Sequence, residues 1–141
     1  MSTAAVPIRE KSEKRWQLWT GWVVSLWPAF VVILSATWKL THNPPYVREF
    51  ARIGWPESAL TLLACLQLGS LALYLIPPTA VLGCVLLTGY LGGAIASYIR
   101  IGDPAPVLVP LSTSMIAWFG LWLRDARLRA LLPIRWPAPR P

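Results

Sequence analysis

Residues 58–99 read SALTLLACLQLGSLALYLIPPTAVLGCVLLTGYLGGAIASYI, two apolar runs separated only by Pro77 and Pro78. The runs, 58–76 and 79–99, cover 19 and 21 residues and contain no Asp, Glu, Lys, Arg or His. An α-helix needs about 20 apolar residues to cross the hydrocarbon core of a bilayer, so each run predicts a membrane-spanning helix. Because a two-residue connection forces antiparallel helices, this stretch predicts a transmembrane helical hairpin.

Two further apolar runs flank the hairpin, at residues 17–38 and 106–123. They are 22 and 18 residues long, and neither has an ionisable residue in its interior. None of the four runs alternates polar with apolar residues as a membrane strand does. We therefore predict an all-α integral membrane four-helix bundle over residues 17–123. A segment at 1–16 precedes it and a basic tail at 124–141 follows it.

The composition of the whole chain agrees with this fold class. Hydrophobic residues make up 55% and charged residues 13% of the 141 residues, whereas soluble domains carry roughly 25% charged residues. This balance excludes an ordinary soluble globule, and it excludes intrinsic disorder. Cys65 and Cys84 lack the spacing of a disulfide framework or a zinc site. The single histidine, His42, lies in a polar turn without a second ligand nearby, so we expect neither metal nor haem.

The distribution of cations predicts the orientation in the membrane. Nine of the 13 Lys and Arg residues fall on the side of the two termini, and four (Lys39, Arg48, Arg52 and Arg100) fall on the opposite side. By the positive-inside rule we expect a multi-pass protein of the inner, cytoplasmic membrane with both termini in the cytoplasm. The Arg-rich tail is expected to lie on anionic lipid headgroups. It provides no folded basic face for nucleic acid.

The connection at residues 39–57 predicts a short helix of its own. Asn43 is placed to cap it, Pro44 to occupy its first turn and Gly54 to follow its end. One face of this helix is apolar and the other is charged, which is typical of a helix lying on the outer membrane surface. The apolar residues are Tyr46, Val47, Phe50 and Ile53.

Small residues and tryptophans mark possible contact surfaces. Gly89, Gly93 and Ser97 recur every four residues, a spacing that predicts close helix packing within the bundle or against a partner subunit. Tryptophans of the first run predict an interface with lipid or a partner; they are Trp16, Trp19, Trp22 and Trp27. The indole of Trp27, inside the span, fits a bond across helices, another protein or a pigment.

The chain also resembles the short members of the DoxX-like family of membrane proteins. The matching segments are FARIGWPES (50–58), LYLIP (73–77), TAVLG (79–83), LTGYLGGA (87–94), GDP (102–104) and LRDARLRALLP (123–133). The resemblance implies a four-helix bundle. Relatives include quinone-linked oxidoreductase subunits, partners in redox-defence complexes and membrane chaperones.

The chain departs from the family pattern at three places. Gln67 stands where the family often has Glu, Pro78 where it often has Arg, and Ser97-Tyr98 where it often has Thr-His. An ionisable group inside a membrane is a functional candidate by default. Its absence argues against a proton relay, haem ligation or acid–base catalysis, although Gln67 can still form a hydrogen bond across helices.

No nucleophile–base pair, phosphate loop or carboxylate dyad is present, so no catalytic residue is predicted. The leading hypothesis is a non-catalytic accessory subunit packed against a larger electron-transfer complex, respiratory or photosynthetic. The alternatives are a quinone-binding redox component and a membrane chaperone or lipid-binding protein. Candidates for contact with quinone or lipid are Glu57, which starts the second run beside Arg48 and Arg52, together with Gln67, Tyr74 and Tyr90.

Overall fold

The computed structural model describes residues 8–131, which are almost entirely helical and contain no strand within that range. The predicted all-α class is therefore confirmed. The elements are α1 (Ile8–Leu40), α2 (Pro44–Arg52), α3 (Ala59–Leu75), the 3₁₀ turn η1 (Pro77–Thr79), α4 (Ala80–Arg100), the 3₁₀ turn η2 (Ala105–Val107), α5 (Leu108–Arg124) and α6 (Ala126–Leu131).

Within residues 8–131, three helical segments are long and apolar enough to cross a membrane. They are Arg15–Leu40, Pro77–Arg100 and Ala105–Arg124. The helix α3 is also apolar but has only 17 residues. A turn precedes its first residue. At its other end the helix stops at Ile76, whose backbone is extended ahead of Pro77. The fourth span and the orientation of the termini remain predictions.

The connections follow the sequence closely. The helix α2 starts directly after Asn43, although the Asn43 side chain forms no capping hydrogen bond. Gly54 follows its end with a φ of +87°, a left-handed conformation that glycine adopts without strain. The fourth run begins with the 3₁₀ turn η2, which contains Pro106. The short helix α6 in the basic tail was not predicted, and residues 132–141 of that tail lie outside the described part of the chain.

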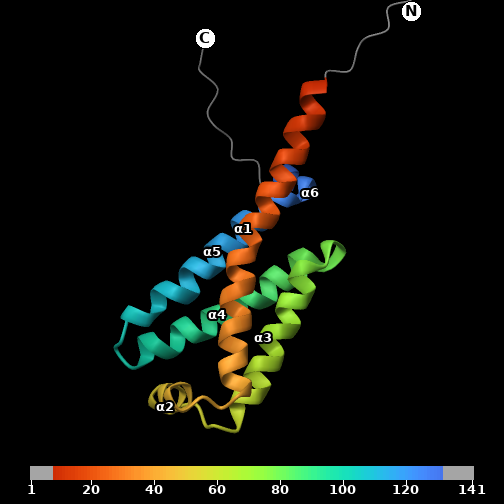
Figure 1. Cartoon of the computed structure of the whole chain (residues 1–141). Coiled ribbons are helices and arrows are strands. Elements are labelled where there is room, and N and C mark those ends of the chain that lie inside the picture. The colour runs from red at the N-terminus through yellow and green to blue at the C-terminus, as the bar shows by residue number, and fades with distance from the viewer. Residues whose placement is uncertain (1–7, 132–141) are drawn as a thin grey trace, which may run out of the picture.

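Four helices pack in a closed circuit of contacts. The helix α1 contacts α3 and α5, and α4 contacts the same two helices. Figure 1 shows α4 and α5 running together and diverging from α1 and α3 toward the end where α2 lies. The start of α1 and the end of α5 lie toward the opposite end (Figure 1). The helices are therefore tightly crossed at one end, called the narrow end below. They are separated at the other, the wide end, where α2 lies.

Glycines at three crossing points allow the tight packing. A Cβ atom on Gly83 of α4 would overlap the Tyr74 amide nitrogen of α3. A Cβ on Gly120 of α5 would lie 2.7 Å from the Ser25 hydroxyl of α1. A Cβ on Gly21 of α1 would lie 2.9 Å from the Arg124 amide nitrogen of α5. At Gly83 and Gly21 the nearest atoms belong to backbone, so no Cβ fits there unless the helices move apart, whereas at Gly120 a Cβ would first displace the Ser25 hydroxyl.

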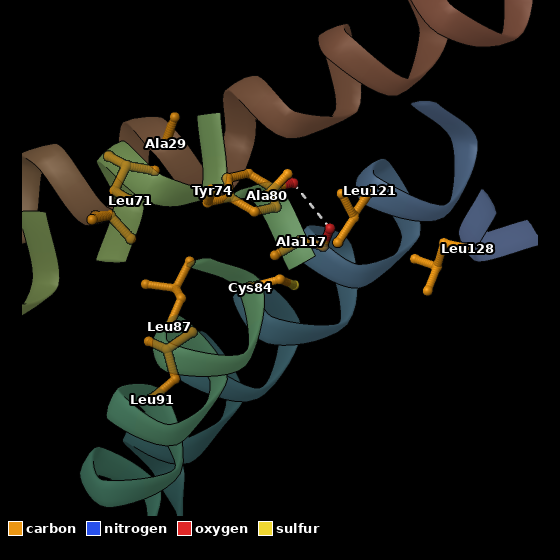
Figure 2. Packing of buried hydrophobic residues seen from close by; sticks show 11 residues of the cluster. Ala29, Leu71, Tyr74, Ala80, Cys84, Leu87, Leu91, Ala117, Leu121 and Leu128 are labelled. Atoms are coloured by element: carbon orange, nitrogen blue, oxygen red, sulfur yellow. Dashed lines mark hydrogen bonds between the residues drawn. The ribbon is translucent and has the colours of Figure 1, made fainter. Parts of the chain in front are cut away.

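Tyr74 holds the same region together through its hydroxyl group. Its side chain is fully buried, and the hydroxyl donates to the Ala117 carbonyl at 2.9 Å (Figure 2). The Ser25 hydroxyl lies 2.9 Å from the same tyrosine oxygen. Tyr74 therefore links α3 to α1 and α5 and belongs to the packed core.

We expect Gly83→Ala to destabilise the protein by about 1–3 kcal/mol, because the added methyl group meets backbone that has no room to yield. The measurement is thermal or denaturant unfolding of the purified protein in detergent. Gly92→Ala is the matched control, since nothing lies within 4 Å of its Cβ position. The control is expected to be neutral or slightly stabilising, because alanine favours the helix. Equal stability of the two variants would contradict the close crossing at Gly83.

Candidate functional site

A cavity of about 590 Å³ lies where the helices diverge. It is lined by residues of α1, α2, α4 and α5 and by Leu63 and Gln67 of α3. Its walls are mostly aliphatic, aromatic or glycine, with a few polar groups among them. This size and character are typical of a site for a small molecule.

Lys39 brings a cation into this cavity. It lies in the last turn of α1, and only 2% of its surface is exposed. Its ammonium donates to the Ser35 hydroxyl at 2.7 Å and to Gln67 Oε1 at 2.6 Å. Gln67 Nε2 in turn donates to the Val32 carbonyl at 3.0 Å. The predicted hydrogen bond of Gln67 across helices is thus confirmed, and it ties α3 to α1.

Aromatic rings surround the same ammonium. Its nitrogen lies 5.7 Å from the ring centre of Tyr46, 5.5 Å from that of Phe50 and 5.4 Å from that of Tyr90. Such ring faces attract a cation, the more so away from water. An ammonium has three N–H donors, and two of them are used by Ser35 and Gln67. Among the described residues the third has no acceptor.

The position of Lys39 corrects the sequence analysis, which counted it as a cation of the outer loop. The helix α1 continues to Leu40, two residues beyond the predicted end of the span, and carries Lys39 into the interior. The sequence did contain an indication that Lys39 has a partner inside the helix bundle. Ser35 stands four residues before Lys39, so the two side chains lie on the same face of the helix.

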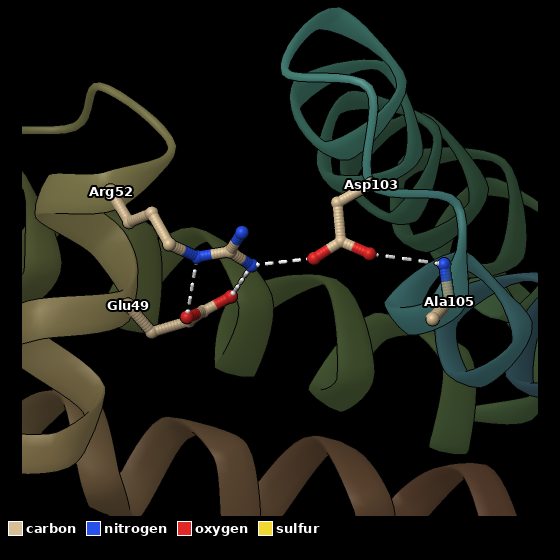
Figure 3. A network of polar contacts seen from close by, with 4 residues as sticks. All are labelled: Glu49, Arg52, Asp103 and Ala105. Atoms are coloured by element: carbon tan, nitrogen blue, oxygen red, sulfur yellow. Dashed lines mark hydrogen bonds and ion pairs between the residues drawn. The ribbon is translucent and has the colours of Figure 1, made fainter.

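An ionic cluster fastens α2 across the wide end of the molecule (Figure 3). Arg52 Nε and Nη2 donate to the two carboxylate oxygens of Glu49, at 3.0 and 2.6 Å. Arg52 Nη2 also donates to Asp103 Oδ2 at 2.9 Å. Asp103 lies between α4 and η2 and accepts the Ala105 amide at 3.3 Å. Arg52 therefore joins α2 to the α4–α5 connection.

The segment after α2 is fastened to α4 as well. Arg100 Nη2 donates to the Ile53 carbonyl at 2.5 Å. The Trp55 indole donates to the Ser97 hydroxyl at 3.2 Å, and that hydroxyl donates to the Gly93 carbonyl at 2.9 Å. These contacts hold Tyr46, Phe50 and Ile53 against the cavity. Val47, the fourth residue of the predicted apolar face, does not line it.

The predicted contact candidates divide into two groups. Gln67 and Tyr90 both line the cavity, whereas Tyr74 lies in the core described above. Glu57 does not line it, and its carboxylate pairs with His42 Nδ1 at 3.0 Å in an exposed position. The ion pairs of Arg52 are with Glu49 and Asp103.

The small-residue stripe of α4 borders the cavity. Within the described chain, nothing lies within 4 Å of a Cβ built on Gly89 or Gly93. The two glycines therefore make no close helix contact within the described bundle, and their packing against a partner subunit stays a prediction. Gly89, Gly93 and Ser97 line the cavity instead, and the absence of side chains at the glycines leaves it open.

The tryptophans of α1 lie on its outer surface. Trp16, Trp19, Trp22 and Trp27 are all exposed. Trp22 also stacks on the guanidinium of Arg124, with 4.6 Å between the ring centre and Cζ. Both cysteines are free, Cys65 exposed and Cys84 buried. In residues 8–131 no group of His, Cys, Asp or Glu is arranged to hold a metal ion.

Long apolar helices around a cavity with a buried cation are the features of a helical membrane protein. Comparison of sequences places the chain more closely. The profile of the DoxX-like family matches residues 23–120, and the chain belongs to this family. No curated protein and no solved structure matches the chain significantly.

The pairing with Arg52 holds the pKa of the Glu49 carboxyl below its usual range. We expect NMR titration of Glu49 to show this depression and Arg52→Met to remove it. The ion pair contributes stability at neutral pH, and this contribution is lost as the pH falls through the depressed pKa. Arg48→Met, an exposed cation on the same helix, is the control and should leave the Glu49 titration unchanged. An ordinary Glu49 pKa in the unmodified protein would refute the ionic fastening of α2.

Proposed function

We propose that this protein binds an amphipathic small molecule from the membrane in the cavity around Lys39. The single observation that supports this most strongly is the buried ammonium with one N–H unused by the described residues. A ligand with an oxygen acceptor completes the hydrogen bonding of this group, and the apolar walls receive the rest of the molecule.

The hydroxyl of Tyr90 offers a second polar contact. No hydrogen bond of this hydroxyl is found among the described residues, although its ring lies beside the Lys39 nitrogen. Both residues line the same cavity, so one polar head can contact both donors. A quinone carbonyl meets this description, as the redox alternative requires, and so does the polar head of a lipid, as the lipid-binding alternative requires.

Filling the cavity tests this function. Gly93→Leu places a side chain in the space that Gly93 leaves open, and we expect it to abolish co-purification of the bound molecule. Gly92→Leu is the matched control, because Gly92 is an exposed neighbour outside the cavity lining with equal room for a side chain. The measurement is mass spectrometry of lipids and quinones extracted from the purified proteins. Identical extracts from both variants and the unmodified protein would overturn the proposal.

A second candidate function, the accessory subunit of a larger membrane complex, is supported by Trp27. Its side chain is 53% exposed in the middle of α1. No acceptor for its indole N–H is found among residues 15–129. Lipid tails supply none either, so a partner subunit offers the acceptor that the indole lacks.

We expect Trp27→Phe, which keeps an aromatic ring and removes the N–H, to weaken assembly roughly fivefold, the effect of losing about 1 kcal/mol from one hydrogen bond. The assembly is measured as the native mass of the tagged protein from its own membranes in mild detergent. Trp19→Phe, nearer the end of the span, serves as the control. If the unmodified protein runs alone or as a homo-oligomer, the accessory-subunit proposal fails.

A further inference from the structure

We propose that the ligand of the Lys39 cavity is a long-chain carboxylate, bound with its carboxylate group on the Lys39 ammonium. This inference rests on the proposed binding function and specifies the charge of the ligand. It follows from the charge balance around the cavity, from the free donors and from the apolar walls.

Every carboxylate in the part of the chain with described side chains is engaged away from Lys39. Glu49 and Asp103 pair with Arg52, and Glu57 pairs with His42. Asp125 accepts the backbone amides of Arg127 and Leu128 at the start of α6. The two remaining acidic residues, Glu10 and Glu13, lie near the other end of α1, about 40 Å away along a helix that rises 1.5 Å per residue.

The Lys39 ammonium is therefore buried without a countercharge from these residues. The oxygens of Ser35 and Gln67 and three aromatic rings compensate only part of the lost hydration. Burying a cation is costly unless it is paired as well as hydrogen-bonded. A ligand carboxylate supplies the missing charge.

The free donors match a carboxylate better than a neutral oxygen. An ionised carboxylate accepts at two oxygens, and it can take the third N–H of Lys39 on one and the Tyr90 hydroxyl on the other. The ammonium attracts an ionised carboxylate through its full negative charge, which a neutral carbonyl lacks, and this attraction is stronger away from water. The site therefore favours a carboxylate over an ester or a quinone carbonyl.

The walls beyond the polar groups fit an acyl chain. They include Val31 and Leu34 of α1, Leu63 of α3 and Val109 of α5. These side chains present no hydrogen-bonding groups, so they select an apolar tail without fixing its orientation. A long-chain carboxylate combines such a tail with the required charge.

The test compares three probes on the full-length protein in detergent: oleate, methyl oleate and decylubiquinone. Binding constants are measured by equilibrium titration with radiolabelled oleate, and the other two probes are measured as competitors. We expect oleate to bind at least about tenfold more tightly than either neutral probe.

Two variants examine the role of charge. Gln67→Glu places a carboxylate oxygen where the amide oxygen already lies 2.6 Å from the Lys39 nitrogen. The new carboxylate has almost the same shape as the amide but competes with the ligand for the cation. We therefore expect this variant to lose the preference for oleate. Lys39→Met removes the cation and is expected to have the same effect. Arg48→Met, an exposed cation outside the cavity lining, should retain the preference.

A tenfold preference that both charge variants abolish supports the carboxylate. Equal binding of all three probes to the unmodified protein overturns it, and so does a preference that survives in Gln67→Glu. In either case, if Gly93→Leu still blocks binding of the probes, the proposed binding function stands and only the preference for a carboxylate fails. If none of the probes binds and no molecule co-purifies, the proposed function fails as well. The comparison of probes on the unmodified protein decides the matter even if a variant does not fold.

Discussion

The arrangement of the wide end of the molecule depends on burying the Lys39 ammonium. Four helices meet at this one group: α1 carries it, α3 supplies the Gln67 amide oxygen, and α2 and α4 supply ring faces. Because a buried cation must be surrounded by acceptors and polarisable groups, α2 has to fold back over the end of α1. The ionic contacts of Arg52 and the hydrogen bond of Arg100 with neighbouring segments then hold α2 in this position.

A second cation lies at the narrow end, where the helices pack tightly. The guanidinium of Arg124 lies between the rings of Trp22 and Tyr74, 4.6 and 4.3 Å from their centres, and Nη2 donates to the Tyr74 carbonyl at 2.5 Å. Here Gly21 and Gly120 bring the helices together. Each end of the bundle thus has a cation packed against aromatic rings, and the cavity of about 590 Å³ lies at the wide end, around Lys39.

The sequence predicted the helices well and the site poorly, for a physical reason. Apolar runs and prolines determine where helices begin and end, because these are properties of neighbouring residues. The role of Gly89 depends on what faces it from another helix, and its spacing cannot distinguish a packed contact from an open cavity. The burial of Lys39 likewise depends on α2, so its place at the end of a span looked like that of a loop cation. Gln67 and Tyr90 were found because polar groups inside a span must have a partner.

The amide at position 67 determines the electrical character of the cavity. The family resemblance implies that a glutamate often stands there, and a carboxylate at 2.6 Å from the Lys39 nitrogen would neutralise it within the protein. Gln67 keeps the same shape and the same acceptor oxygen but contributes no charge. Because Gln67 also donates to the Val32 carbonyl, its orientation is fixed with the oxygen toward Lys39. With glutamine at this position, none of the residues that line the cavity supplies a negative charge to the Lys39 ammonium.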